Sequence, residues 1–189
     1  MAPPLSITSI MTVLLLAFAS TMAADLSPME QAIVEHVDAR SSAALDLLER
    51  TVNINSGTMN FAGVRAVGQV FRAEFDNLGF RTRWEDGAAT GRAGHLVAEF
   101  GTRGIHLLLI GHLDTVFEPD SPFQRYEQIS PGQARGPGTT DMKGGNVIIL
   151  EALRAIKAVG SIENMQITVV LIGDEESSGR PLKAARAVL

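Results

Sequence analysis

The chain has 189 residues, of which 46% are hydrophobic and 20% are charged, so it can bury a sizeable core and is not a disordered protein. Its formal net charge of −5 argues against a nucleic-acid partner, because such a protein needs a basic surface. The absence of cysteine excludes thiolate zinc sites, disulfides and cysteine nucleophiles.

The first 24 residues carry no Lys, Arg, Asp or Glu and predict a signal peptide. An apolar stretch too short for a transmembrane span precedes small residues, and Thr21 stands close before a cleavage point after Ala23. We therefore expect residues 1–23 to be removed and the mature protein to be periplasmic or secreted, without membrane contact. The alternatives are a buried N-terminal helix or a mis-set start codon, since no Lys or Arg precedes the apolar stretch.

Two amphipathic helices are predicted next. The first covers residues 25–55 and begins with a capping signal in which Glu30 lies three positions after Ser27. Its apolar positions at helical spacing are Ile33, Val37, Ala44, Leu48 and Val52. The second covers residues 62–78 and ends at a glycine. Its apolar stripe consists of Val64, Val67, Phe71, Phe75 and Leu78.

Strands and helices then alternate. Short strands are predicted at 80–85 and 95–100, and the nearly all-apolar segment 105–110 predicts a strand covered on both faces. Residues 118–140 are rich in Pro, Gly, Ser and Thr and predict a loop. The remaining predicted elements are a helix at 142–159, a buried strand at 166–172 and a helix at 181–189.

This alternation predicts an α/β layered fold with a largely parallel central sheet flanked by helices. The chain ends within the last predicted helix, at Leu189, and is therefore expected to be a fragment.

A histidine and an aspartate directly follow the strand at 105–110. Ligands of open α/β sheets bind at the carboxyl ends of strands, and a spacing of two places His112 and Asp114 on the same side. A metal-binding imidazole usually donates its other N–H to a carboxylate, and Asp114 is available for this bond. The alternative is an ordinary surface histidine with satisfied hydrogen bonds.

Asp141 lies where a Gly-rich loop meets a predicted helix. Helix N–H groups and the helix dipole stabilise a carboxylate there, so Asp141 is either an N-cap or a ligand that bridges two cations. Gly144 and Gly145 weaken the first turn of this helix and are expected only where the backbone packs closely against a neighbour.

Glu175 and Glu176 follow the strand at 166–172. Two adjacent carboxylates repel each other and are costly without a cation nearby. One can bind a metal while the other takes a proton from the attacking water. The alternative is an exposed acidic turn, but three such clusters in one chain are far more specific than any one alone.

The sequences GHLDTV (111–116), GPGTTDMKGG (136–145) and GDEESSG (173–179) resemble the signature of peptidase family M20, the two-zinc aminoacylases and carboxypeptidases. Members include acetylornithine deacetylase, succinyl-diaminopimelate desuccinylase and glutamate carboxypeptidase. Together with the leader and residues 52–58, the chain is most similar to the bacterial glutamate carboxypeptidase branch. The resemblance implies that residues 24–189 are the N-terminal part of a zinc-hydrolase catalytic domain, without the family's small dimerisation domain.

The resemblance also implies roles for five residues. His112 and Glu176 each bind a zinc ion and Asp141 bridges the two ions, for which Co or Mn can substitute. Asp114 orients His112, and Glu175 is the general base and then the acid. The implied reaction is cleavage of an amide or peptide bond next to a C-terminal amino acid, glutamate in this branch. The substrate is a small molecule or peptide with a free carboxylate, and the full-length protein is expected to be a homodimer.

Two further metal ligands of the family, a carboxylate and a late histidine, have no counterpart in this chain, so the fragment is expected to be inactive alone. Four alternatives stay open. They are an N-acyl amino acid deacylase of the same family, a dipeptidase, a non-catalytic truncated module, and a two-metal phosphatase or nuclease, for which no P-loop or basic cluster is visible.

Overall fold

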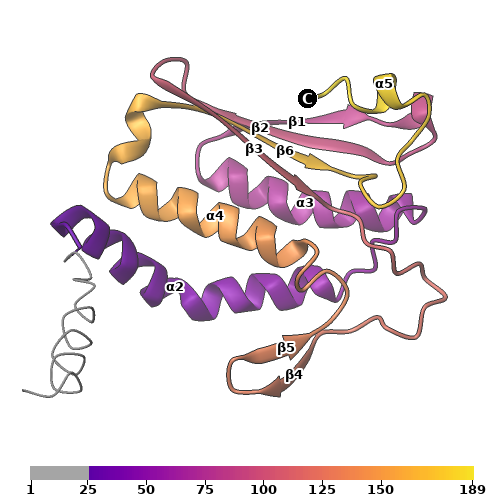
Figure 1. Cartoon of the computed structure of the whole chain (residues 1–189), viewed down its shortest axis with the longest axis horizontal. Helices are drawn as coiled ribbons and strands as arrows, with labels where there is room; N and C mark the ends of the chain where they lie inside the picture. Colours follow the sequence, from indigo (N-terminus) through magenta and orange to yellow (C-terminus); the bar gives the residue numbers. More distant parts are fainter. Residues whose placement is uncertain (1–25) are drawn as a thin grey trace, which may run out of the picture.

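The computed structural model describes residues 26–189, so the signal peptide predicted for residues 1–23 lies outside the described residues. The described part forms a four-stranded sheet, helices packed on that sheet, and a separate two-stranded hairpin (Figure 1). No helix in this part of the chain is both long and apolar enough to cross a membrane.

Helix α2 (Pro28–Val52) begins at the predicted capping signal. The Ser27 hydroxyl accepts the Glu30 N–H at 3.3 Å, and the Ser27 N–H donates to the Glu30 carboxylate at 2.7 Å. The predicted apolar face is buried only near the C-terminal end, where Val52 is fully buried, whereas Val37 is exposed. The reason is that α2 is an outer helix, which packs on α4 instead of on the sheet (Figure 1).

Helices α3 (Phe61–Asn77) and α4 (Lys143–Ala158) cover one face of the sheet (Figure 1). The stripe predicted for α3 is buried over its whole length, from Val64 to Leu78. It forms the main core with apolar side chains of the two central strands, and these are Leu96, Ala98, Ile167, Val169 and Leu171.

The sheet has the strand order β1 (Arg81–Asp86), β2 (Gly94–Phe100), β6 (Met165–Ile172) and β3 (Ile105–His112). The α/β class is confirmed, but the prediction of a largely parallel sheet is wrong for the described strands. Only β3 and β6 are parallel, whereas β2 is antiparallel to both β1 and β6. Residues 87–93 are too few for a crossover and join β1 to β2 as a hairpin, while α4 provides the crossover that a parallel pair needs.

Strand β3 is not covered on both faces, which corrects the sequence-based expectation. Ile105 is 65% exposed, Leu108 52% and Ile110 48%. The apolar run was sufficient to predict a strand, but β3 is one of the two edge strands of the described sheet. On the sheet face opposite α3 and α4, Val188 packs against a small cluster formed by Val97, Val170 and Ile172.

The segment 118–140 is not entirely loop, because it contains a hairpin of β4 (Glu127–Ser130) and β5 (Gln133–Arg135). Its turn is Pro131-Gly132, in which Gly132 has a φ of 82°. This positive φ favours glycine, and proline precedes it in many such turns. The Pro-Gly pair was the available signal, but the flanking strands are too short for their alternation to be recognised.

The last predicted helix, 181–189, is shorter than expected. Helix α5 covers only Leu182–Ala185. Arg186 stands at its C-terminal end and directs its guanidinium group to Asp174 in the loop after β6. The end of α5 thus coincides with a contact between Arg186 and a residue 12 positions away, which local periodicity could not reveal.

Candidate metal centre and catalytic site

The three predicted clusters meet at one edge of the sheet. Strands β3 and β6 are adjacent and parallel, and His112 pairs with Ile172 at their carboxyl ends. The loop after β6 therefore begins beside His112. The potential ligand atoms of His112, Glu175 and Glu176 all lie within 4.8 Å of one another. Asp141 joins them from the loop before α4, with one carboxylate oxygen 2.9 Å from His112 Nε2.

His112 is buried at the end of β3 between two acidic residues. Its Nδ1 lies 3.1 Å from the Asp114 carbonyl oxygen and 3.3 Å from an Asp114 carboxylate oxygen, while Nε2 faces Asp141. Burial by itself would lower the pKa of His112, but the contacts with Asp114 and Asp141 outweigh it and raise the pKa to about 9. The surroundings of this imidazole thus favour a positive charge, which either a proton or a metal ion can supply.

Asp114 is fully buried and contacts three separate segments that form the site. Its carboxylate accepts the N–H groups of Glu175 and Glu176, each at 3.1 Å, and the Thr58 hydroxyl at 2.7 Å. Burial would raise the pKa of Asp114, but the hydrogen bonds from His112 and Thr58 outweigh it and lower the pKa. Asp114 contacts His112 through both its carbonyl and its carboxylate oxygens, and its orienting role stays a prediction. The contact with the glutamate loop and the contribution of Thr58 were not predicted from the sequence.

Asp141 is not the N-cap of α4, so this alternative is wrong. The helix begins at Lys143, its N-cap residue is Met142, and no side chain caps it. The Asp141 side chain is 72% exposed and contacts His112 Nε2, the nitrogen through which this imidazole can bind a metal. Whether Asp141 bridges two ions stays a prediction.

Glycines hold the backbone of the site in close contact, as the sequence predicts for the start of α4. A Cβ atom on Gly144 would lie 2.2 Å from the Thr139 carbonyl oxygen, and one on Gly111 would lie 2.2 Å from Asn146 Oδ1. A side chain at Gly144 would collide with backbone, and one at Gly111 would require the Asn146 side chain to move. The loop that carries Asp141 and the first turn of α4 can therefore lie directly against the end of β3.

The two adjacent glutamates have different surroundings. Glu175 is exposed and Glu176 is half-buried. Burial raises the pKa of Glu176, the carboxylates of Asp141 and Asp114 raise it further, and only His112 opposes them. This crowding of acidic groups agrees with the expectation that the pair requires a cation nearby.

Two buried polar residues at the start of α4, Lys143 and Asn146, hydrogen-bond to backbone next to the site, and no role was predicted for them. Lys143 is fully buried and donates to the carbonyl oxygens of Thr51 at 3.0 Å and Ile54 at 2.9 Å. Burial lowers the pKa of Lys143 to about 7. Asn146 donates to the His112 carbonyl oxygen at 2.6 Å. Polar residues one turn apart at the start of an apolar helix were the available signal, because buried polar groups need partners.

The residues present fit a metal ion. Histidine nitrogens and carboxylate oxygens are zinc ligands in proteins, and His112 lies here beside Glu176 and Asp141. The Nδ1 contact of His112 is the usual support of a metal-binding imidazole. Within residues 26–189, His112, Glu175 and Glu176 are the one group of three potential ligands that lie this close together.

Comparisons with known proteins define the class of this fold and site. Residues 108–189, which contain every predicted site residue, match the sequence profile described as Peptidase family M20/M25/M40. The structure of human carnosine dipeptidase 1 is similar over 82% of this chain and 36% of that protein, with a TM-score of 0.69 and 19% identity. An M20 family metallo-carboxypeptidase from Sulfolobus solfataricus is similar over 70% of this chain and 31% of that protein, with a TM-score of 0.59 and 20% identity. At these identities the two structures show the fold alone.

The chain is similar to peptidase family M20/M25/M40, as the sequence motifs predict. Carboxypeptidase G2 of Pseudomonas sp. strain RS-16 is 32% identical over 177 residues, which are 93% of this chain and 42% of that protein. Succinyl-diaminopimelate desuccinylase of Methylocella silvestris is 34% identical over 86 residues, which are 43% of this chain and 22% of that protein. The chain thus spans less than half of the length of these relatives.

Proposed function

We propose that the complete protein is a zinc-dependent carboxypeptidase that hydrolyses the amide or peptide bond before a C-terminal amino acid, with glutamate preferred. The observation that carries the proposal is the convergence of His112, Glu175 and Glu176, with Asp141 at His112 Nε2. The similarity to carboxypeptidase G2 over 93% of the chain supports this branch of the family. The substrate is a small molecule or peptide with a free carboxylate.

In this proposal His112, Asp141 and Glu176 would hold the zinc ions, with Asp141 shared by the two. When bound, zinc supplies Lewis-acid chemistry that makes water acidic enough for a carboxylate base. Glu175 takes a proton from the attacking water, whose oxygen forms a bond to the carbonyl carbon. Glu175 then delivers the proton to the leaving nitrogen as the C–N bond breaks.

The different surroundings of the two glutamates support this division of roles. Glu176 is half-buried among acidic groups, where a bound cation relieves the most repulsion. Glu175 is exposed, so its carboxylate can meet both water and substrate. The Asp114 carboxylate holds the backbone N–H of both residues, which fixes where each side chain begins.

Four further properties belong to the same proposal; export rests on the uncharged apolar leader, and the other three rest on the resemblance. The four properties are export to the periplasm or cell exterior after removal of residues 1–23, a site of two zinc ions that Co or Mn can replace, a homodimer of the complete protein, and no hydrolysis by residues 24–189 alone.

The second candidate is an N-acyl amino acid deacylase, which the similarity to succinyl-diaminopimelate desuccinylase favours. Hydrolysis of N-acylglutamates, acetylornithine and succinyl-diaminopimelate by the complete gene product, with and without a chelator, separates the candidates. We expect chelator-sensitive hydrolysis of the acylglutamate and its loss in Glu175→Gln. A matched control is Glu163→Gln, which changes an exposed glutamate before β6. Hydrolysis that survives complete metal removal would contradict the proposal, and a preference for acetylornithine would move the protein to the deacylases.

A further inference from the structure

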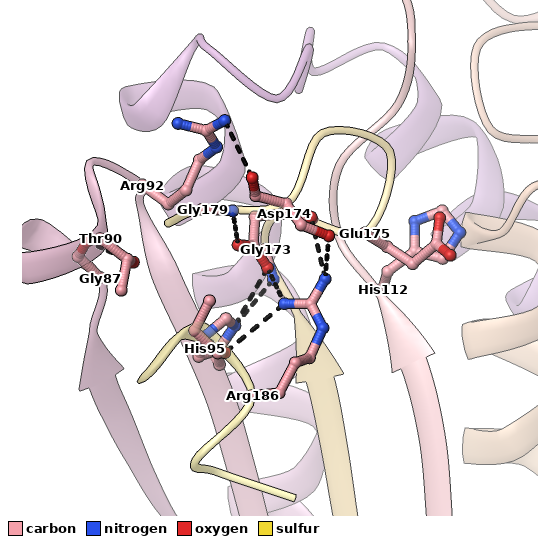
Figure 2. A network of polar contacts seen from close by, with 12 residues as sticks. Gly87, Thr90, Arg92, His95, His112, Gly173, Asp174, Glu175, Gly179 and Arg186 are labelled. Atoms are coloured by element: carbon pink, nitrogen blue, oxygen red, sulfur yellow. Dashed lines mark hydrogen bonds and ion pairs between the residues drawn. The ribbon is translucent and has the colours of Figure 1, made fainter. Parts of the chain in front are cut away.

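A buried carboxylate adjoins the paired glutamates and takes no part in the proposed chemistry. Asp174 is fully buried and directly precedes Glu175 in the loop after β6. Figure 2 shows that its side chain meets Arg186, whereas Glu175 extends toward His112. A buried charge is costly unless it is paired and hydrogen-bonded, so the partners of Asp174 indicate its purpose.

The hydrogen bonds of Asp174 connect the beginning of the loop after β6 to its end. One carboxylate oxygen accepts the Gly179 N–H at 2.7 Å, and the other accepts a guanidinium N–H of Arg186 at 2.6 Å. Arg186 also donates to the Asp174 carbonyl oxygen at 3.3 Å and to the Ser178 hydroxyl at 2.6 Å. We call this set of four residues the Asp174 clamp, and it joins the two ends of the segment 174–179.

A second buried carboxylate holds the same segment from the side of the metal centre. Asp114 accepts the N–H groups of Glu175 and Glu176, as described above. The backbone that carries both glutamates therefore lies between Asp114 and Asp174. These two residues differ in what they bind, since Asp114 also contacts His112 while Asp174 is paired with Arg186.

The turn between β1 and β2 supports the outer side of the segment (Figure 2). Arg92 donates to the carbonyl oxygens of Ser177 at 2.6 Å and Ser178 at 3.3 Å. His95 accepts the Gly173 N–H at 3.2 Å, and its Nδ1 lies 4.0 Å from Asp174. The much closer Arg186 is therefore the principal cationic partner of Asp174.

We propose that Asp174 and Arg186 are positioning residues, which set Glu175 and Glu176 in their places relative to His112. An ordinary stabilising ion pair is the simpler explanation, and its loss would lower global stability without a specific effect on the loop. A positioning role predicts instead a specific loss of order in the loop and of turnover, because a displacement of about 1 Å in a catalytic group can reduce a rate roughly 100-fold. The kinetic part of this inference rests on the proposed function, whereas its structural part does not.

Hydrogen exchange in the metal-free complete protein tests the structural part. In Asp174→Asn, we expect the amides of residues 175–179 to exchange at least about tenfold faster, because the closure of the loop is lost. The matched control is Glu151→Gln, which alters another buried carboxylate, paired with Arg40 and Arg154 far from the loop in sequence. This control should leave exchange in the loop unchanged. Equal exchange in the loop of the wild type and Asp174→Asn would overturn the inference.

Kinetics and zinc binding test the functional part. We expect Arg186→Met to reduce kcat about 10- to 100-fold with KM within about threefold, and to weaken zinc binding in chelator competition. Arg186→Lys keeps the charge and should retain part of both the turnover and the zinc affinity that Arg186→Met loses. If Asp174→Asn does not fold, Arg186→Met serves for the exchange measurement, with the same expected acceleration. Glu151→Gln should lower Tm but leave kcat unchanged.

Three results separate failure of this inference from failure of the proposed function. If Arg186→Met lowers Tm like Glu151→Gln but changes neither kcat nor zinc affinity, the pair is only structural and the inference is wrong. If the fold reduction of kcat in the double variant Asp174→Asn, Arg186→Met equals the product of the reductions in the two single variants, the residues act independently and the inference is also wrong. If the wild type hydrolyses no acylated amino acid, the proposed function fails, while exchange and zinc affinity still decide the inference.

Discussion

Replacement of Asp114 by asparagine is the most informative single perturbation of the site. The substitution keeps size and shape but replaces one acceptor oxygen with an NH₂ group, which is a donor. The carboxylate of Asp114 faces donors on both of its oxygens, namely the N–H of Glu175 on one and the N–H of Glu176 with the Thr58 hydroxyl on the other. The asparagine amide can satisfy only one of these sides.

The magnitude follows from these contacts. In either orientation of the amide, a backbone N–H of the glutamate loop meets another donor and loses its acceptor, which costs about 1–3 kcal/mol in a buried setting. The remaining bonds lose the strengthening that an ionised acceptor gives, about 1 kcal/mol in total. We therefore expect Asp114→Asn to lower the free energy of unfolding by about 2–4 kcal/mol and to loosen the loop that carries Glu175 and Glu176.

Urea unfolding of the complete protein without metal measures this loss. Thr58→Val is the matched control, because it removes one donor to Asp114 and should cost only about 1 kcal/mol. The double variant should show a coupling energy between Asp114 and Thr58 of about 0.5 kcal/mol or more. If Asp114→Asn were no more destabilising than Thr58→Val, the assignment of Asp114 as the residue that joins the loop to β3 would be refuted.

The remaining predictions concern the metal ligands and the pH dependence of stability. Glu175→Gln should retain zinc while kcat falls roughly 10²- to 10⁴-fold, and Glu176→Gln should instead weaken zinc binding. Zinc titrations and turnover of both variants test this, and the reverse pattern would mean that Glu175 binds zinc and Glu176 is the base. Asp141→Ala should lose both zinc ions or nearly so, and two equivalents of zinc by metal analysis would contradict the bridging role. Burial lowers the pKa of His95 below its ordinary 6.5, so the unfolded chain binds more protons than the folded one below that pH. The stability that neutral His95 contributes is therefore complete above about pH 6.5 and is lost as the pH falls below it. Urea unfolding of the wild type and of His95→Gln between pH 5 and 8 measures this loss. If both proteins lose the same stability over that range, His95 is not its source. The charged groups that act on His95 are Asp174, Arg186 and Glu85.

Local signals in the sequence were sufficient for the helices and for the outline of the site. The capping box at Ser27 and the stripe on α3 depend on neighbours within one or two turns, so the sequence alone specifies them. The approach of Glu175 to His112 was also predictable, because it requires only that β3 and β6 be parallel neighbours. These are contacts that periodicity and strand direction determine.

Other features depend on which distant residues meet, and the sequence did not reveal them. An apolar run identifies β3 as a strand but does not say that β3 lies at the edge of the described sheet. Lys143 has its acceptors on α2, and Asp174 has its cation beyond α5, in each case through tertiary packing. Thr58 bonds to Asp114 across 56 positions of the chain. No pattern within a single element indicates such partners.

The position of β3 has a consequence for handling the protein. Its outer edge has no partner among the described strands, and its exposed apolar side chains include Ile105, Leu108 and Ile110. An edge of this kind is a template to which a strand of another molecule can add. Residues 26–189 expressed alone should therefore self-associate, and Leu108→Lys should reduce the light scattering of concentrated samples, because an edge lysine opposes strand addition.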